Sequence, residues 1–167
     1  MTGDRWLDDL LDLLLALDGV AQPARYHPEG DALYHSLQVF DCARRETNDR
    51  TMWAAALLHD VGKAIDGRTH DEVGADLLDG LVCPRVVWLV RHHLDLLRVP
   101  ARTRRKRRGT RDLADLERLR RWDLGGRRPG AQVLSARDAL EILLENGSDA
   151  LSPSGPPLIS NDERIIE

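Results

Sequence analysis

Apolar side chains recur at intervals of three and four residues along most of the chain, which is the spacing of one face of an α-helix. The first such series begins after a capping aspartate, Asp4, stops at Gly19, and has as its apolar members Leu7, Leu10, Leu11, Leu14 and Leu15. No run of useful length alternates apolar and polar residues as a half-buried strand does. The pattern therefore predicts helices and no sheet.

Similar start and stop signals delimit six further helices. We expect them at about residues 31–46, 49–59, 69–81, from Pro84 past His92, 111–124, and from Ser135 to about residue 146. The segment at 49–59 is apolar nearly all round, which is typical of a buried central helix. Ser135 with Asp138 three residues on resembles a capping box. We predict an all-α domain of six to seven helices over residues 1–147, followed by a Pro- and Ser-containing tail at 148–167.

Composition agrees with one globular domain. The 167 residues are 42% hydrophobic and 31% charged, and aromatic residues make up only 4%, which argues against an aromatic-rich β-sandwich. The two cysteines provide neither a disulfide framework nor a zinc knuckle, so we expect a reducing compartment. No apolar run approaches the roughly 18 residues that a membrane span needs, and the leucine-rich start is interrupted by acids. We expect a cytoplasmic protein.

Basic residues gather in one part of a chain whose net charge is −4. The centre of this region is the run Arg102, Arg104, Arg105, Lys106, Arg107 and Arg108. Two interpretations remain open: a surface for an anionic partner such as RNA or a nucleotide phosphate, or a solvated, flexible loop.

Candidate chemistry lies in the histidines. His59 and Asp60 end the most buried of the predicted helices, where desolvation penalises a charged carboxylate unless something compensates it. A divalent cation compensates well, because imidazole and carboxylate are ligands of borderline metals. Adjacent helical residues point about 100° apart, so the remaining ligands must come from other helices. His35 is one candidate, and Asp123 is another.

Asp123 is preferred to Asp112 and Asp115 as the acid from the helix at 111–124. The order His35, then His59–Asp60, then a distant Asp123 resembles the HD-domain metal-dependent phosphohydrolase superfamily. The stretches YHPEGDALYHSLQVF, ALLHDVGKA, WDLGGR and PPLISND are closer still to the HD domain attached to bacterial tRNA nucleotidyltransferases, the CCA-adding enzymes. This resemblance covers roughly residues 23–162 and implies an orthogonal helical bundle. The nucleotidyltransferase part is absent from these residues, so we expect a stand-alone HD domain without CCA addition.

The resemblance implies a ligand set. His35, His59, Asp60 and Asp123 would hold a first divalent ion, with Mn, Fe, Co, Ni or Zn more suitable than Mg. By similarity to the dinuclear HD branches, Asp60 would bridge to a second ion. The ligands of that ion would be His70 and His92, with His93 in place of His92 if the helix phase differs by one residue. His27 and Glu29 would shape the turn before the helix at 31–46, or Glu29 would itself be a ligand.

The activity implied is hydrolysis of nucleotide or RNA 3′-end phosphoesters by a metal-activated water, with Asp60 and Lys63 as catalytic residues. The substrates would be 2′,3′-cyclic phosphodiesters, 2′-nucleotides or phosphomonoesters. Lys63 would contact a phosphate oxygen, or would be only a cation at a helix C-terminus. The expected anion-binding side chains are Arg102, Arg104, Arg105, Lys106 and Arg127, and RNA would bind through residues 102–111. The alternative is a non-catalytic HD scaffold that binds a nucleotide or RNA.

Overall fold

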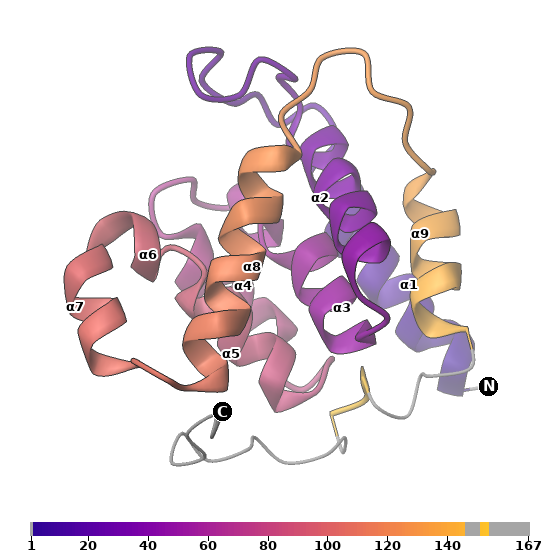
Figure 1. Cartoon of the computed structure of the whole chain (residues 1–167). Helices are drawn as coiled ribbons and strands as arrows, with labels where there is room; N and C mark the ends of the chain where they lie inside the picture. The colour runs from indigo at the N-terminus through magenta and orange to yellow at the C-terminus, as the bar shows by residue number, and fades with distance from the viewer. Residues whose placement is uncertain (1, 146–150, 154–167) are drawn as a thin grey trace.

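The computed structural model describes residues 2–145 and 151–153, and the described part is all-helical (Figure 1). Its elements are α1 (Thr2–Leu15), α2 (Ala32–Glu46), α3 (Arg50–Leu58), the 3₁₀ helix η1 (Val61–Ala64), α4 (His70–Leu78), α5 (Pro84–His92), α6 (Asp95–Arg98), α7 (Pro100–Lys106), α8 (Arg111–Gly125) and α9 (Ala136–Leu144). Extended pairing in this part is limited to two isolated bridges. The all-α prediction is confirmed, with somewhat more helices than expected.

Side-chain caps begin several of these helices close to the predicted helix starts, although α1 already includes Asp4, the residue expected to cap it. Asp31 accepts a hydrogen bond from the Tyr34 amide at 2.9 Å and so caps α2. Asp49 caps α3 in the same way. The Ser135 hydroxyl accepts from the Asp138 amide at 3.1 Å at the start of α9. These bonds satisfy amides that lack a partner within the helix, which places the helix starts close to their predicted positions.

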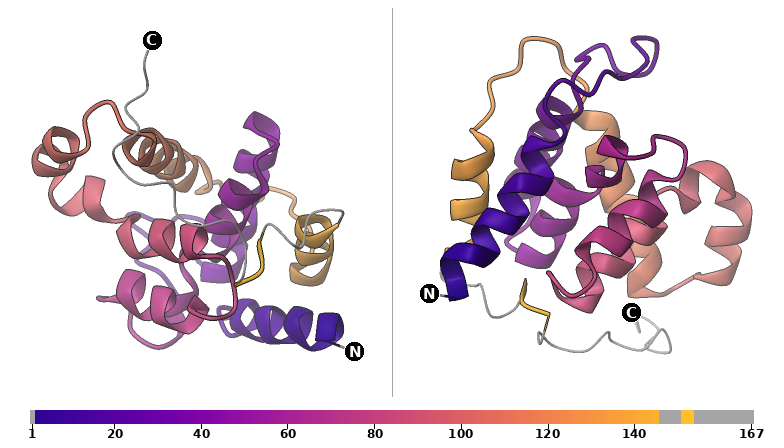
Figure 2. Two further views of the ribbon diagram at one scale, coloured as in Figure 1. Left: turned by 90° about the horizontal axis from the view of Figure 1, so that it is seen from below. Right: turned by 180° about the vertical axis from the view of Figure 1, so that it is seen from behind.

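Helices α2 and α3 form the centre of the molecule. Both contact α8 and α9, while α3 also packs on α5, and α4 pairs with α5 (Figures 1 and 2). The side chains of α3 from Ala54 to Leu58 are at most 1% exposed, which confirms the prediction of a buried central helix. Two apolar clusters fill the interior. One lies toward α1 and α9, and the other lies between α2, α3 and α8.

The basic run departs from prediction. Residues 100–106 form α7 rather than a loop, with Pro100 in its first turn. Proline suits that position because its fixed φ matches the helix and its missing amide needs no partner there. Arginine and lysine are good helix formers. Thr103 and Arg107 lie on the buried side of this short helix.

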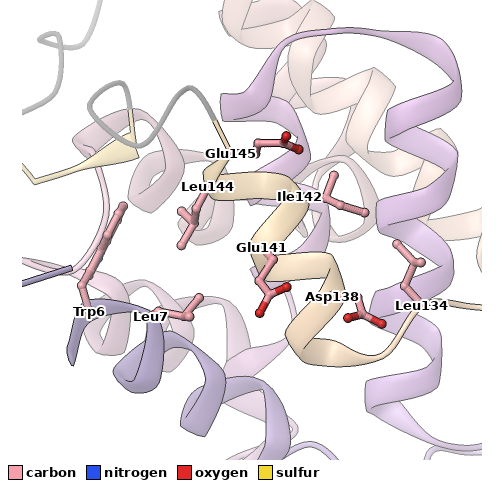
Figure 3. Close-up of a pocket in the computed structure, with 8 residues that line it drawn as sticks. All are labelled: Trp6, Leu7, Leu134, Asp138, Glu141, Ile142, Leu144 and Glu145. Atoms are coloured by element: carbon pink, nitrogen blue, oxygen red, sulfur yellow. The ribbon is translucent and has the colours of Figure 1, made fainter. Parts of the chain in front are cut away.

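Helices α1 and α9 lie side by side and border an apolar groove (Figure 3). Its lining residues are Trp6, Leu7, Leu134, Asp138, Glu141, Ile142, Leu144 and Glu145. None of them is a histidine, so this groove is separate from the candidate chemistry. Among the helices described, none is long and apolar enough to cross a membrane.

The predicted boundary between domain and tail falls among residues 146–150, outside the described residues, and it stays a prediction. The seventh predicted helix, by contrast, ends earlier than the expected 146–147: α9 stops at Leu144, and Glu145 already has extended backbone. Just beyond residue 150, Leu151 is 1% exposed and its carbonyl accepts from the Cys83 amide at 2.7 Å. The apolar core therefore includes at least one residue from the segment predicted as tail.

Candidate metal centre

Four histidine side chains come together in the interior, although they come from four different helices or helix ends. His35 lies in α2, His59 is the C-cap of α3, His70 begins α4 and His93 is the C-cap of α5. The ring centroids of His35 and His59 are 5.5 Å apart, and those of His59 and His70 each lie 5.2 Å from that of His93. All four are buried. We call these residues, together with Asp60 and Asp123, the His–Asp cluster.

The backbone holds one nitrogen of each ring. In three rings Nδ1 contacts the carbonyl oxygen of the residue three positions earlier: His59 with Ala56 at 2.8 Å, His70 with Gly67 at 2.9 Å and His93 with Val90 at 2.6 Å. In His35, Nδ1 lies 2.9 Å from the Gly126 carbonyl. A carbonyl can only accept, so Nδ1 is the donor in each case. In the neutral rings Nε2 is then left as a lone-pair acceptor facing the interior, as in metal-ligating histidines.

In the neutral rings, the inward nitrogens of His59, His70 and His93 face other acceptors rather than donors in the described part of the chain. His59 Nε2 is buried and has no hydrogen-bond partner. His70 Nε2 and His93 Nε2 lie 3.3 Å apart, two acceptors facing each other when both rings are neutral. A cation placed between such lone pairs removes their repulsion, so the residues present fit a metal ion.

Asp60 joins the histidines through both of its carboxylate oxygens. Oδ1 lies 3.1 Å from His70 Nε2 and 3.7 Å from His93 Nε2. Oδ2 lies 3.3 Å from His59 Nε2 and 3.7 Å from His35 Nε2. One carboxylate thus faces two pairs of imidazoles, which is the arrangement that a bridging ligand between two ions requires.

The donor atoms form overlapping groups. His35, His59 and Asp123 bring ligand atoms within 4.8 Å of one another, and so do Asp60, His70 and His93. A third group consists of His27, Glu29 and His35. In that group Glu29 Oε1 lies 2.8 Å from the Nδ1 atoms of both His27 and His35, so it meets the outer nitrogen of the His35 ring.

Burial and charge set the ionisation of the cluster. Burial lowers the pKa of His93 to about 3, and the neighbouring imidazoles act in the same direction, so this ring is neutral at pH 7. For Asp60, burial raises the pKa, but the electrostatic interactions with His59 and Lys63 outweigh it and hold the pKa well below its usual value.

The pKa values of Asp123 and His35 are shifted in opposite directions. Burial raises the pKa of Asp123, yet the hydrogen bond with His35 leaves it below the usual range. For His35, burial lowers the pKa, but the bond to Asp123, with Nε2 to Oδ1 at 3.1 Å, raises it overall. The cluster therefore supplies ionised carboxylates beside imidazoles in a buried space, the donor set of a borderline divalent metal.

Cationic side chains border both aspartates. Lys63 Nζ lies 2.7 Å from Asp60 Oδ2 and 2.6 Å from Gln22 Oε1. Arg120 and Arg127 contact the two oxygens of Asp123 at 3.0 and 3.3 Å. Sequence reasoning missed Gln22 and Arg120. Arg120 lies three residues before Asp123 on a helix, a spacing that could have revealed it, whereas nothing in the sequence pointed to Gln22.

Several candidate residues lie elsewhere. His92 Nδ1 bonds Asp95 at 2.8 Å, and its ring centroid lies 4.5 Å from that of Trp88, so of the two alternatives His93 is the one in the cluster. Asp112 and Asp115 instead bind the Arg85 guanidinium at 2.5 and 2.7 Å. Arg102, Arg104, Arg105 and Lys106 lie on α7, where none bonds a cluster residue in the described part of the chain.

Two glycines allow the backbone to approach closely around the cluster. A Cβ atom on Gly62 would lie 2.7 Å from the Gly74 amide nitrogen and would also meet the His70 carbonyl, so only glycine lets η1 rest against α4. At Gly126 a Cβ would lie 2.5 Å from a Val39 methyl group, so glycine there brings the carbonyl that binds His35 against α2. Steric constraints thus explain why glycine stands at position 62 in the HDVGK segment and at position 126 in the GG segment.

Comparison with known proteins gives one family and several relatives. A family model described as HD domain matches residues 32–143. A multifunctional CCA protein of Methylococcus capsulatus is 43% identical over 76 residues, which is 41% of this chain and 18% of that protein. A multifunctional CCA protein of Hahella chejuensis is 37% identical over 82 residues, 45% of this chain and 19% of that protein. The matched part thus spans less than a fifth of each relative.

Proposed function

Because the chain belongs to the HD domain family, whose members are generally metal-dependent hydrolases, we propose that it is a metal-dependent phosphohydrolase of nucleotide or RNA-end phosphoesters. The substrates we propose are 2′,3′-cyclic phosphodiesters, 2′-nucleotides and phosphomonoesters. The two multifunctional CCA proteins support a substrate connected with RNA, and the family supports the hydrolytic chemistry.

One observation carries the proposal. The His–Asp cluster directs imidazole Nε2 atoms and carboxylate oxygens at each other, with His70 Nε2 and His93 Nε2 only 3.3 Å apart and His59 Nε2 buried without a partner. Buried polar atoms without partners are unfavourable in a fold that has no use for them. A purely structural cluster would bond these nitrogens to protein donors.

Two ions would share the cluster through Asp60. His35, His59, Asp60 and Asp123 would hold the first ion, and Asp60, His70 and His93 would hold the second. Divalent ions of the Mn, Fe, Co, Ni or Zn type, when bound, act as Lewis acids and make water a nucleophile near neutral pH. His92 takes no part in this proposal, because it bonds Asp95 instead.

The chain's own residues would position the phosphate. The side chain of Lys63 is 15% exposed, so its ammonium lies at the edge of the cluster beside Asp60. From there it would bind a non-bridging phosphate oxygen and stabilise the charge that develops in the transition state. Arg127 lies beside Asp123 and would be a second phosphate contact. Asp60 would keep Lys63 oriented in addition to binding metal.

The direct test combines metal analysis with a substrate panel. Purified protein should contain a stoichiometric transition metal and should hydrolyse 2′,3′-cAMP or bis-p-nitrophenyl phosphate. Asp60→Ala should remove the metal and reduce turnover by a factor on the order of 10² or more, since it deletes a ligand and an electrostatic partner together. Asp76→Ala is the control, because Asp76 is exposed and pairs only with Arg91 in the described structure.

Two outcomes would contradict the proposal. Turnover that survives in Asp60→Ala would show that the reaction takes place elsewhere. A metal-loaded wild-type protein that binds nucleotide or RNA but never hydrolyses any member of the panel would instead be a binding module built on the HD scaffold.

A further inference from the structure

Helices α6 and α7 form an arm at one side of the molecule. The arm follows directly on His93 in sequence and packs against α8, and it stands out from the bundle in all views (Figures 1 and 2). Arg98 ties the arm to the region of His70. Its guanidinium bonds Asp71 at 2.6 Å and the Arg68 carbonyl at 2.9 Å. The arm is therefore held beside the His70–His93 half of the His–Asp cluster.

Most arginines around the arm have acidic partners. Arg104 pairs with Glu117, Arg107 with Asp112 and Arg111 with Asp49. The Arg107 guanidinium also lies 4.8 Å from the centre of the Trp88 ring, and this side chain is buried. These cations are explained by the packing of the arm on α5 and α8.

The remaining cations of the arm are different. Arg102, Arg105, Lys106 and Arg108 are exposed and have no ion pair or hydrogen bond to any acid in the described part of the chain. Arg102, Arg105 and Lys106 are spaced i, i+3 and i+4, which puts them on one exposed face of α7, whereas Thr103 and Arg107 are buried. We call these three residues, together with Arg108 in the turn just after the helix, the basic face of α7.

The cations of the basic face of α7 have no acidic partner in the described part of the chain to offset their mutual repulsion. Like charges at i, i+3 and i+4 on a helix repel each other. Lys106 is also one of only two lysines in the chain. Clustered cations without internal partners beside a site for phosphoesters match the electrostatic footprint of a nucleic-acid backbone.

We propose that the basic face of α7 binds the phosphate backbone of an RNA strand whose end reaches the His–Asp cluster. The inference rests on the proposed function, and it favours RNA because 2′,3′-cyclic and 2′-phosphate ends require a ribose 2′-oxygen. Arg68 is exposed in the loop before His70, and its carbonyl accepts a hydrogen bond from Arg98 of the arm, so this further cation adjoins both the arm and the loop that leads to His70.

The test measures binding of a fluorescent 12-nucleotide single-stranded RNA by anisotropy over a range of salt concentrations. The variant Arg102→Gln/Arg105→Gln/Lys106→Gln should bind about tenfold or more weakly at low salt. The slope of log affinity against log salt should fall by about 2, since about 0.7 counterions are released for each contact with a single strand. The control Arg91→Gln/Arg118→Gln/Arg121→Gln removes the same charge from arginines that are paired with Asp76 and Glu46, and should bind nearly as wild type does.

A second variant separates charge from folding. Arg102→Lys/Arg105→Lys keeps the charge and should keep the affinity. Equal losses in the triple variant and its control, or unchanged binding in the triple variant, would overturn the proposal. So would stronger binding to phosphatidylserine vesicles than to RNA at the same salt. Hydrolysis of 2′,3′-cAMP by wild type is measured separately. RNA binding at α7 without that hydrolysis would refute the proposed function but would support the RNA-binding surface. Hydrolysis without RNA binding at α7 would support the proposed function and refute the RNA-binding surface.

Discussion

At the scale of single residues, the chemistry of the cluster depends on which nitrogen each histidine directs inward. His59 and His93 are both C-caps, and the last carbonyls of a helix have no amide partner within it. In each case the ring donates Nδ1–H to the carbonyl three residues back, at 2.8 Å from Ala56 and 2.6 Å from Val90. A helix end that would otherwise be unsatisfied thus sets the tautomer that leaves Nε2 free.

Substitution of the neighbouring residues His93 and His92 tests whether the inward Nε2 atoms bind metal, with His92 as the matched control. His93→Ala should lower the bound metal by about one equivalent and turnover at least tenfold, because it removes a proposed ligand of the second ion. His92→Ala removes an imidazole that bonds Asp95 and should leave metal content and turnover nearly unchanged. Metal content by elemental analysis and initial rates on bis-p-nitrophenyl phosphate provide both measurements. Equal effects of the two substitutions would show that the position of His93 has no special role.

The same pair shows where prediction from sequence stops. Pro84 and the apolar series located the start of α5 and carried the helix to the two histidines. Adjacent residues point about 100° apart, so a shift of one residue in the helix end decides which ring enters the interior. Helix ends are uncertain by one or two residues even when a structure is known. Both histidines therefore had to stay candidates until the packing of α5 was known.

At the scale of elements, the cluster is built mostly from helix ends that converge. His59 ends α3, Asp60 precedes η1, His70 begins α4, and Asp123 lies in the last turn of α8. Such an arrangement needs close contact between the short connections, and Gly62 supplies it between η1 and α4. The periodicity of the chain predicted the helices themselves, but the contact of η1 with α4 involves backbone atoms that no hydrophobic pattern encodes.

Gly62→Ala should therefore disturb the centre without touching a ligand. Its Cβ would lie 2.7 Å from the Gly74 nitrogen, and backbone cannot move aside as a flexible side chain can. We expect a loss of about 1–3 kcal/mol in the free energy of unfolding, together with weaker metal binding as Asp60 and His70 move apart. Gly67→Ala is the matched control, because a Cβ there meets nothing within 4 Å. Denaturant unfolding and metal titration of both variants measure the two effects, and identical curves would contradict the steric argument.

For α7, the composition of the sequence gave a wrong indication of the local structure. The clustered charges of residues 102–108 resembled a solvated loop, yet Pro100 and good helix formers start a helix that packs through Thr103 and Arg107. The partners of Arg107, Asp112 and the Trp88 ring, lie on other helices. Local sequence cannot reveal such contacts, so charge density alone was a poor guide to structure there.

At the scale of the whole molecule, the cluster links α2, α3, η1, α4, α5 and α8 at one point. The order of His35, His59, Asp60 and Asp123 in the sequence suggested that these residues meet, because the same order occurs in a known family. Their actual convergence required tertiary packing. This packing brings the Nε2 atoms of His70 and His93 to 3.3 Å and buries the carboxylate of Asp60, both of which are unfavourable unless a cation lies among them.

Metal removal should therefore destabilise the whole fold rather than one loop. A ligand that binds only the native state stabilises it by about 4 kcal/mol when present at 1,000 times its Kd, and for a domain of this size each kcal/mol shifts Tm by roughly 2–4 °C. Wild-type protein stripped with EDTA should unfold on the order of 10 °C lower than metal-loaded protein in thermal scans followed by circular dichroism. Asp60→Ala should show no such difference between EDTA and added metal, because it lacks the carboxylate that faces both groups of donors. A loaded wild-type protein whose Tm does not respond to EDTA, while elemental analysis shows that the metal has left, would mean that the ion is not coupled to the packing of these helices.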